Sequence, residues 1–439
     1  MCTRLTTWVV ATLTGLAAWA TVPASAEAAG QPPTCNGLPA TITEANSAGV
    51  VHGTDGDDVI VFSDAKAVEA MAGDDTICSR GGPIGHFFVH VDAGEGDDYV
   101  DASATSVGLF GARLGAGADT YVGSPGRDEV STDAAASEGD ALEGRDVVRT
   151  GAGFDSAFAG PLDGGMVNDD IDLGSGDSVL ELYAAPSPEA RMVASQDGRS
   201  RLLAYGGEGA WVVDLAGSEL TIDEGEPVEL RGFTEINLSA RFEDFGPPNI
   251  SSVHVVGGPA AEVVSYDGHL IADLGGGDDR VEGVADQLGD LRGGSGADSL
   301  VLGKNPRVPG RTTTTVDLRR GLLVLRGATR KSTALNGFEN VSANLNRASL
   351  IGTSGSNRLT VLGDKCDVRL DGLGSDDVLR VSTKSRCGTV TPLNGGPGND
   401  RLYGGDGRDA LRGGRGRDVA VGGGNTDLCR AEVRRRCER

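Results

Sequence analysis

Four aspartates that recur every nine residues near the end of the chain are the residues best suited to chemistry. Asp400, Asp409, Asp418 and Asp427 each close a segment of the form Gly-Gly-x-Gly-x-Asp, and a short x-apolar-x segment follows each one. A hard cation prefers oxygen ligands, and it accepts backbone carbonyls as readily as carboxylates. Glycines allow the backbone angles of a tight turn at little steric cost. This spacing predicts calcium binding in the turns of a parallel β-helix.

Short strands must position these turns. The three residues after each turn form a strand too short to be stable alone, and we expect its middle apolar residue to point inward. These inward residues are Leu402, Leu411, Ala420 and Leu428. Two nonapeptides complete one coil, so turns eighteen residues apart stack on the same side. We therefore expect Asp400 to lie near Asp418 and Asp409 near Asp427. A flexible, solvated glycine-rich linker would have no reason to keep the apolar residue in phase.

The repeats resemble the RTX, or haemolysin-type calcium-binding repeat, family of secreted bacterial proteins. The resemblance implies that each ion lies between stacked turns, held by sixth-position aspartates and by carbonyls of the glycine-rich positions. The implied carboxylate ligands are Asp400, Asp409, Asp418 and Asp427. The implied carbonyl ligands are Gly395, Gly396, Gly398, Gly404, Gly405, Gly407, Gly413, Gly414 and Gly416. The fourth copy departs from the pattern because Asn425 replaces its fourth-position glycine.

Degenerate copies of the same turn occur far upstream. Their candidate metal-binding aspartates are Asp58, Asp98, Asp119, Asp128, Asp279, Asp298 and Asp376. Many of the N-terminal turns lack the first glycine or lie off the eighteen-residue stacking distance. We expect some of their aspartates to cap turns by accepting backbone N–H bonds instead of binding metal.

The composition agrees with a cation-binding protein. The chain of 439 residues has a net charge of −25, 69 glycines and only 4% aromatic residues. Excess carboxylate repels itself in a compact state, and bound cations would relieve that repulsion. The same charge opposes binding of polyanions such as nucleic acids, and no phosphate-binding or nucleic-acid motif is present.

The N-terminus predicts a secretory signal peptide. Arg4 provides a positive start, residues 8–20 form an apolar core, and Ala24-Ser25-Ala26 is a small-residue cleavage site. The apolar stretch is shorter than the roughly 20 residues needed to span a membrane. Six cysteines remain after Cys2 leaves with the signal, which suggests disulfides in an exported chain. Of fifteen connectivities we prefer Cys366–Cys387, Cys429–Cys437 and Cys35–Cys78.

We predict an all-β fold, an elongated parallel β-roll or β-solenoid with irregular coils in its middle. The middle contains a second duplication: Val213-Asp214-Leu215 followed by Gly232-Phe233 parallels Val316-Asp317-Leu318 followed by Gly337-Phe338. The expected segments are a signal peptide (1–26), a lead (27–48), a degenerate nonapeptide solenoid (49–165), an irregular β module ending in RTX-like turns (166–302), a second irregular β module (303–390), a regular RTX β-roll (391–429) and a basic tail (430–439).

Signatures of catalysis are sparse. The close histidine pair, His86 and His90, lacks the glutamate of a His-Glu-x-x-His zinc motif, and no Gly-x-Ser-x-Gly elbow occurs. We therefore predict a secreted, non-enzymatic calcium-binding protein whose roll folds on binding extracellular Ca²⁺. Two alternatives remain open. One is a polysaccharide-active β-helix enzyme with its site between residues 166 and 270. The other is a cell-wall or adhesion protein that uses calcium only as a structural staple.

Overall fold

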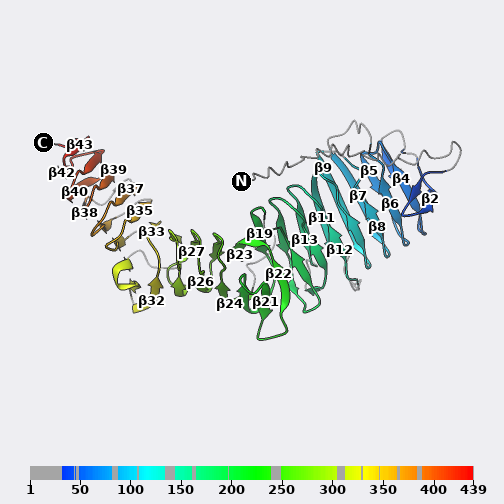
Figure 1. Ribbon diagram of the computed structural model, residues 1–439, viewed down its shortest axis with the longest axis horizontal. Coiled ribbons are helices and arrows are strands. Elements are labelled where there is room, and N and C mark those ends of the chain that lie inside the picture. The colour runs from blue at the N-terminus through cyan, green and yellow to red at the C-terminus, as the bar shows by residue number, and fades with distance from the viewer. Residues whose placement is uncertain are drawn as a thin grey trace, which may run out of the picture.

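The protein is an elongated solenoid of stacked parallel strands, seen here in a computed structural model (Figure 1). The structure describes residues 32–43, 45, 49–81, 88–105, 108–133, 144–160, 165–195, 197–238, 249–303, 312–327, 330–345, 347–362, 366–382 and 388–438. Within these ranges the chain makes about 16 turns. The predicted all-β solenoid is confirmed. The predicted signal peptide lies outside the described residues.

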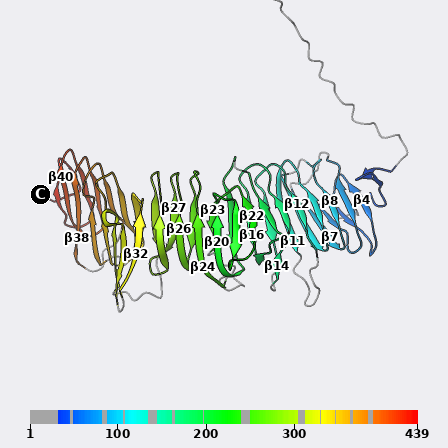
Figure 2. The same cartoon turned by 60° about the horizontal axis from the view of Figure 1, so that its bottom comes forward.

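The first of two long sheets runs the length of the solenoid, with its strands stacked side by side in Figure 2. Its strands are β4 (Val59–Phe62), β6 (Thr76–Ser79), β8 (Tyr99–Asp101), β10 (Thr120–Val122), β12 (Val147–Arg149), β15 (Asp170–Asp172), β18 (Arg191–Val193), β20 (Glu208–Asp214), β21 (Glu219–Ile222), β22 (Val228–Arg231), β24 (Asn249–Val256), β26 (His269–Asp273), β28 (Leu288–Arg292), β30 (Thr313–Asp317), β31 (Leu322–Arg326), β32 (Arg330–Asn336), β34 (Arg347–Ile351), β36 (Asp367–Asp371), β38 (Val390–Pro397), β40 (Arg408–Arg415) and β42 (Leu428–Arg430).

The second long sheet is parallel throughout its described strands. These are β3 (Val50–His52), β5 (Ala67–Glu69), β7 (Phe88–Glu95), β9 (Leu109–Ala116), β11 (Arg127–Asp133), β13 (Ser156–Ala159), β16 (Val179–Leu182), β19 (Ser200–Ala204), β23 (Phe233–Asn237), β25 (Val263–Tyr266), β27 (Arg280–Val284), β29 (Ser299–Gly303), β33 (Asn340–Ala343), β35 (Arg358–Leu362), β37 (Val378–Ser382), β39 (Arg401–Gly405), β41 (Val419–Gly423) and β43 (Val433–Arg435). Two small pairs, β1 (Thr34–Cys35) with β2 (Leu38–Pro39) and β14 (Met166–Val167) with β17 (Ala185–Pro186), and a 3₁₀ turn, η1 (Leu318–Arg320), complete the described elements.

Two nonapeptides complete one coil in the C-terminal region, as predicted. Leu402 of β39 is in register with Ala420 of β41, and Leu411 of β40 is in register with Cys429 of β42. Each pair is eighteen residues apart. Elsewhere the turns are less regular, and neighbouring N-terminal strands of the first sheet are offset by 17 residues (Val59 with Thr76) to 27 residues (Thr120 with Val147).

The core is a narrow column of small and medium apolar side chains between the two sheets. Strands alternate buried and exposed positions, because successive side chains point to opposite faces of a sheet. Leu402, Leu411 and Ala420 are buried as predicted. The prediction for Leu428 was wrong, because its side chain is 59% exposed and Cys429 takes the inward position. Cys429, and not Leu428, stands two residues after the aspartate, as in the other three copies.

The two duplicated segments in the middle of the chain adopt the same arrangement. β20, β21 and β22 form an antiparallel meander within the first sheet, and β30, β31 and β32 form another. Asp214 and Asp317 end the first strand of each meander, and each accepts a backbone N–H from the turn that follows. The sequence parallel thus corresponds to two structurally equivalent insertions in an otherwise parallel stack.

Disulfides close both ends of the described solenoid. Cys35–Cys78 and Cys429–Cys437 are bonded as predicted. Cys366 is also disulfide-bonded, and its predicted partner Cys387 lies outside the described residues. No helix among the described residues is long and apolar enough to cross a membrane.

Candidate calcium-binding turns

The glycines of each turn are required by the stacking of the turns as well as by their own backbone angles. In the turn that ends at Asp400, Gly396 and Gly398 have φ values of 118° and 149°, which side chains with a Cβ rarely adopt. A Cβ on Gly396 would lie 2.1 Å from the carbonyl oxygen of Leu373, and a Cβ on Gly398 would lie 2.0 Å from that of Ser375. Both carbonyls belong to the preceding coil. Glycine at positions two and four therefore lets successive turns approach closely.

The first glycine of each repeat makes room for the aspartate of the same repeat. A Cβ on Gly395 would lie 2.2 Å from Oδ2 of Asp400, and a Cβ on Gly413 would lie 2.1 Å from Oδ2 of Asp418. The same relation holds between Gly404 and Asp409 and between Gly422 and Asp427. Each carboxylate thus folds back over its own turn and is buried there.

Aspartates eighteen residues apart meet across neighbouring coils. Oδ1 of Asp418 accepts the backbone N–H of Asp400 at 2.9 Å, and Oδ1 of Asp427 accepts that of Asp409 at 3.0 Å. Asp400 and Asp418 lie at the start of strands of the second sheet, whereas Asp409 and Asp427 lie at the start of strands of the first. The predicted juxtaposition of both pairs is confirmed, and the two pairs lie at opposite corners of the roll. Their role as calcium ligands stays a prediction.

Hydrogen bonds of the same kind, from the backbone N–H of one position-six residue to the side chain of the next, join the turns along two long columns. In the N-terminal column Asp75 accepts from Asp58, Asp98 from Asp75, Asp119 from Asp98, Asp146 from Asp119 and Asp169 from Asp146. In the C-terminal column Asp279 accepts from Glu262, Asp298 from Asp279, Glu339 from Asp298, Asp377 from Asn357, Asp400 from Asp377, Asp418 from Asp400 and Glu432 from Asp418. The expected capping of backbone N–H groups is confirmed for Asp98 and Asp119. Because Asp400 and Asp418 cap in the same way, capping does not distinguish the degenerate turns from the regular ones.

The second carboxylate oxygen, Oδ2, has no hydrogen-bond partner in many of these turns, degenerate and regular alike. Oδ2 is buried without a hydrogen-bond partner in ten aspartates of the described chain: Asp75, Asp98, Asp155, Asp279, Asp298, Asp377, Asp400, Asp409, Asp418 and Asp427. Burial, together with the charges of neighbouring aspartates, raises the pKa of Asp98 to about 8 and that of Asp409 to about 7. Burying an unpaired carboxylate is costly unless it binds a proton or a cation. These oxygens therefore fit a bound cation, and calcium accepts this donor set.

In a second kind of turn the carboxylate is saturated by hydrogen bonds. Oδ2 of Asp58 accepts both the backbone N–H and the hydroxyl of Thr54, each at 2.8 Å. Oδ2 of Asp128 accepts the N–H of Ser124 at 2.9 Å, and its Oδ1 accepts the Ser124 hydroxyl at 2.9 Å. Asn357 is held in the same way by Thr353.

The residue at position two decides between the two kinds of turn. Thr54, Ser124 and Thr353 are absent from the positive-φ region, and their N–H groups point to the side chain at position six. In the turns of the unpartnered aspartates, position two has a positive φ, as at Gly396 and Gly414. No N–H from that position reaches the carboxylate within the described residues. A serine or threonine at position two thus marks a turn closed by its own hydrogen bonds.

The residues at position five form a second, exposed column of hydrogen bonds. In this outer column the side chain of the earlier turn accepts the N–H of the later turn, the reverse of the inner column. Oδ1 of Asp376 accepts the N–H of Asn399 at 2.7 Å, and Oδ1 of Asn399 accepts that of Arg417 at 3.0 Å. Asp376, a predicted metal ligand, therefore lies in the outer column. Its neighbour Asp377 is buried and is in line with Asp400.

Besides Asp377, the sequence prediction missed four members of the inner C-terminal column. They are Glu262, Glu339, Asn357 and Glu432, which carry a glutamate or an asparagine at the sixth position. Two segments, Gly257-Gly258-Pro259-Ala260-Ala261-Glu262 and Gly352-Thr353-Ser354-Gly355-Ser356-Asn357, keep the glycines and the length of the motif. Allowing Glu or Asn at position six would have found both.

No three side chains of His, Cys, Asp or Glu converge on one point in the described parts of the chain. An ion at these turns would therefore have at most two carboxylate ligands, such as those of Asp400 and Asp418. Backbone carbonyls and water would have to complete a shell of six to eight oxygens.

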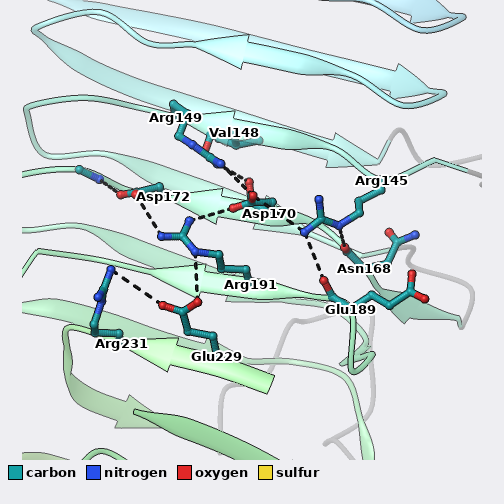
Figure 3. A network of polar contacts seen from close by, with 11 residues as sticks. Arg145, Val148, Arg149, Asn168, Asp170, Asp172, Glu189, Arg191, Glu229 and Arg231 are labelled. Atoms are coloured by element: carbon teal, nitrogen blue, oxygen red, sulfur yellow. Dashed lines mark hydrogen bonds and ion pairs between the residues drawn. The ribbon is translucent and has the colours of Figure 1, made fainter. Parts of the chain in front are cut away.

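An ion-pair network occupies the outer face of the first sheet where the N-terminal column ends (Figure 3). Asp170 of β15 pairs with Arg149 at 2.8 Å and with Arg191 at 2.9 Å, and Arg191 also reaches Glu229 at 3.2 Å. Burial raises the pKa of Asp170, but the hydrogen bonds and charges of the two arginines outweigh it and lower the pKa overall. The network links β12, β15, β18 and β22 after the last aspartate of the column, Asp169.

Comparison with known proteins agrees with the position of the regular turns. Residues 393–429 match the family model described as the RTX calcium-binding nonapeptide repeat, in four copies. A search of the curated proteins finds no match to the chain. The RTX nonapeptide repeat binds Ca²⁺.

Proposed function

Because residues 393–429 are RTX calcium-binding repeats on a β-solenoid, we propose that the chain is a secreted, non-catalytic calcium-binding protein. Its C-terminal coils fold when calcium binds outside the cell. The single observation that supports this most is the set of buried Oδ2 atoms without partners in successive turns. A folded chain without cations would bury these charges unpaired.

The ions would be held where two turns stack. One position lies between the turns of Asp400 and Asp418, and another lies at the opposite corner between those of Asp409 and Asp427. Gly395, Gly404 and Gly413 leave the carboxylates room to fold back. The upstream turns of Asp98, Asp279 and Asp298 have the same unpartnered oxygen and form a second group of proposed sites. We assign Asp58 and Asp128 to closed, metal-free turns because Thr54 and Ser124 saturate them.

Calcium would contribute a large part of the stability of the C-terminal coils. Extracellular calcium modules bind with dissociation constants of about 10⁻⁴ to 10⁻³ M. Free ion at about ten times the dissociation constant stabilises a folded state by roughly 1.4 kcal/mol per site. Several sites in one stack would therefore add an amount comparable to the net stability of a small domain, about 5–15 kcal/mol.

Three features support export. The sequence carries a predicted signal peptide at residues 1–26, and RTX repeats are typical of secreted proteins. The disulfides Cys35–Cys78 and Cys429–Cys437 suit an oxidising compartment. Calcium is scarce inside cells and abundant outside, so coupling of folding to calcium would delay formation of the roll until after export.

A calcium titration of the full mature chain tests the proposal. Circular dichroism should show a gain of β-structure on adding calcium and its loss on adding EGTA, and calorimetry should give the number of ions bound. The variant Asp418→Asn with Asp427→Asn should bind fewer ions. Asp406→Asn, an exposed residue of the same coils, should bind as many as wild type. Identical spectra and no heat of binding with calcium would refute the proposal.

A further inference from the structure

The C-terminal roll is basic on its outside, in contrast to the rest of the chain. Residues 393–439 contain ten arginines and seven acidic residues, whereas the whole chain has a net charge of −25. Four of the seven acidic side chains, Asp400, Asp409, Asp418 and Asp427, are buried in the turns. Fields of surface charges are screened over about 8 Å at physiological ionic strength. A ligand at the roll would therefore sense the local arginines more than the distant carboxylates.

A groove of about 300 Å³ crosses the outer face of the first sheet on this roll, over β36, β38, β40 and β42. Pro392 is in register with Ala410, and Ala410 with Leu428, so these residues form an apolar strip across three strands. Asn394, Arg412 and Arg430 are in register along one side of the strip. Leu428, which lies on the outer face of β42, is exposed.

Arg412 and Arg430 are exposed neighbours of like charge. Their strands are paired, so the two side chains leave the sheet about 4.8 Å apart along the solenoid axis. Like charges directly opposite one another destabilise a sheet. Arg369 of β36, at one end of the strip, is paired with Asp371 at 3.1 Å, and Asp371 is in register with Asn394. No carboxylate pairs with Arg412 or Arg430 in the described structure. An anion between the two guanidinium groups would remove their repulsion.

We propose that this groove binds an acidic polysaccharide, one whose sugar units carry carboxylates. Guanidinium groups bind carboxylates through two parallel hydrogen bonds. The strip of Pro392, Ala410 and Leu428 suits the apolar face of a sugar ring. The groove has the volume of a small-ligand site and is open at the surface, so a linear polymer can lie along the solenoid axis.

The chemistry of the groove favours a saccharide over a single-stranded nucleic acid. Binding of single strands relies on aromatic side chains on which bases stack. The groove is lined by Arg369, Leu370, Pro392, Leu393, Asn394, Ala410, Leu411, Arg412, Leu428 and Arg430, with no aromatic residue among them.

The groove is built on β38, β40 and β42, the strands that the calcium-binding turns connect. Saccharide binding should therefore require calcium, an expectation that rests on the proposed function. Circular dichroism reports folding of the roll separately from saccharide binding. Failure of calcium-induced folding and failure of saccharide binding can therefore be told apart.

Calorimetry with a short oligogalacturonate, in saturating calcium and with the full mature chain, tests the groove. Wild type should bind it and should not bind a neutral cello-oligosaccharide. Arg412→Gln with Arg430→Gln should weaken binding about tenfold or more, because each arginine contributes a charge-assisted hydrogen bond. The matched control is Arg401→Gln with Arg435→Gln, which removes the same charge from exposed positions of the second sheet in the same coils. The control should bind as wild type does.

Three results would overturn the proposal. They are no binding by a folded, calcium-loaded wild type, equal weakening in both double variants, and tighter binding of an oligonucleotide than of the uronate. The second would show attraction to net charge alone. The third would assign the groove to nucleic acid.

Discussion

Replacing Asp409 by asparagine should change stability in opposite directions with and without calcium. Burial and the charge of Asp427 raise the pKa of Asp409 to about 7 from 3.8. A shift of that size corresponds to roughly 4 kcal/mol. Solvent screening reduces it, so we expect the charged carboxylate to cost the calcium-free fold about 2 kcal/mol at pH 8. Asparagine keeps the shape and removes the charge.

The sign of the pH dependence follows from the raised pKa. An acid with a raised folded-state pKa binds more protons when folded, so its contribution to stability is lost as pH rises from about 4 to about 7. Without calcium, Asp409→Asn should therefore populate the folded coils more than wild type does at pH 8 and about equally at pH 4. In saturating calcium at pH 8 the variant should be less stable, because it has lost a charged ligand.

Urea unfolding followed by circular dichroism measures the free energy of unfolding in all three conditions. Asp58→Asn serves as control, because Thr54 already saturates that carboxylate. The change in the free energy of unfolding caused by Asp58→Asn should have the same sign with and without calcium. A loss of stability for Asp409→Asn in EGTA at pH 8 would show that the carboxylate is not an unpaired buried charge, and the reasoning would fail.

Three further substitutions test other parts of the structure. Gly414 has a φ of 134°, and a Cβ there would lie 1.9 Å from the carbonyl oxygen of Gly396 in the preceding coil. Gly414→Ala should therefore cost about 3 kcal/mol or more and abolish calcium-induced folding. Gly424→Ala, at position three of its repeat, should be tolerated. Ser124→Ala should cost about 1 kcal/mol equally with and without calcium, as judged by urea unfolding. Leu402→Ala should cost about 2–5 kcal/mol, whereas Leu428→Ser should change the free energy of unfolding by less than about 0.5 kcal/mol. A large loss for Leu428→Ser would contradict the register of β42.

Local features of the sequence were enough to predict the regular coils. The nine-residue phase, the glycines and the apolar position fix one turn and one short strand, and two repeats make one coil. Stacking of Asp400 on Asp418 followed from that arithmetic alone. The one-residue error at Leu428 arose from assigning the fourth copy by hydrophobicity and not by its distance from Asp427.

The sequence by itself determined the repeat, the fold class and the family of the last coils, because these depend on contacts within nine or eighteen residues. The tertiary structure decided which carboxylates are saturated and which are buried without a partner. That outcome depends on the backbone angle at position two and on turns joined over unequal distances, such as Asp298 and Glu339, 41 residues apart. It also placed Arg412 beside Arg430 over an apolar strip, since only the register of neighbouring strands brings those side chains together.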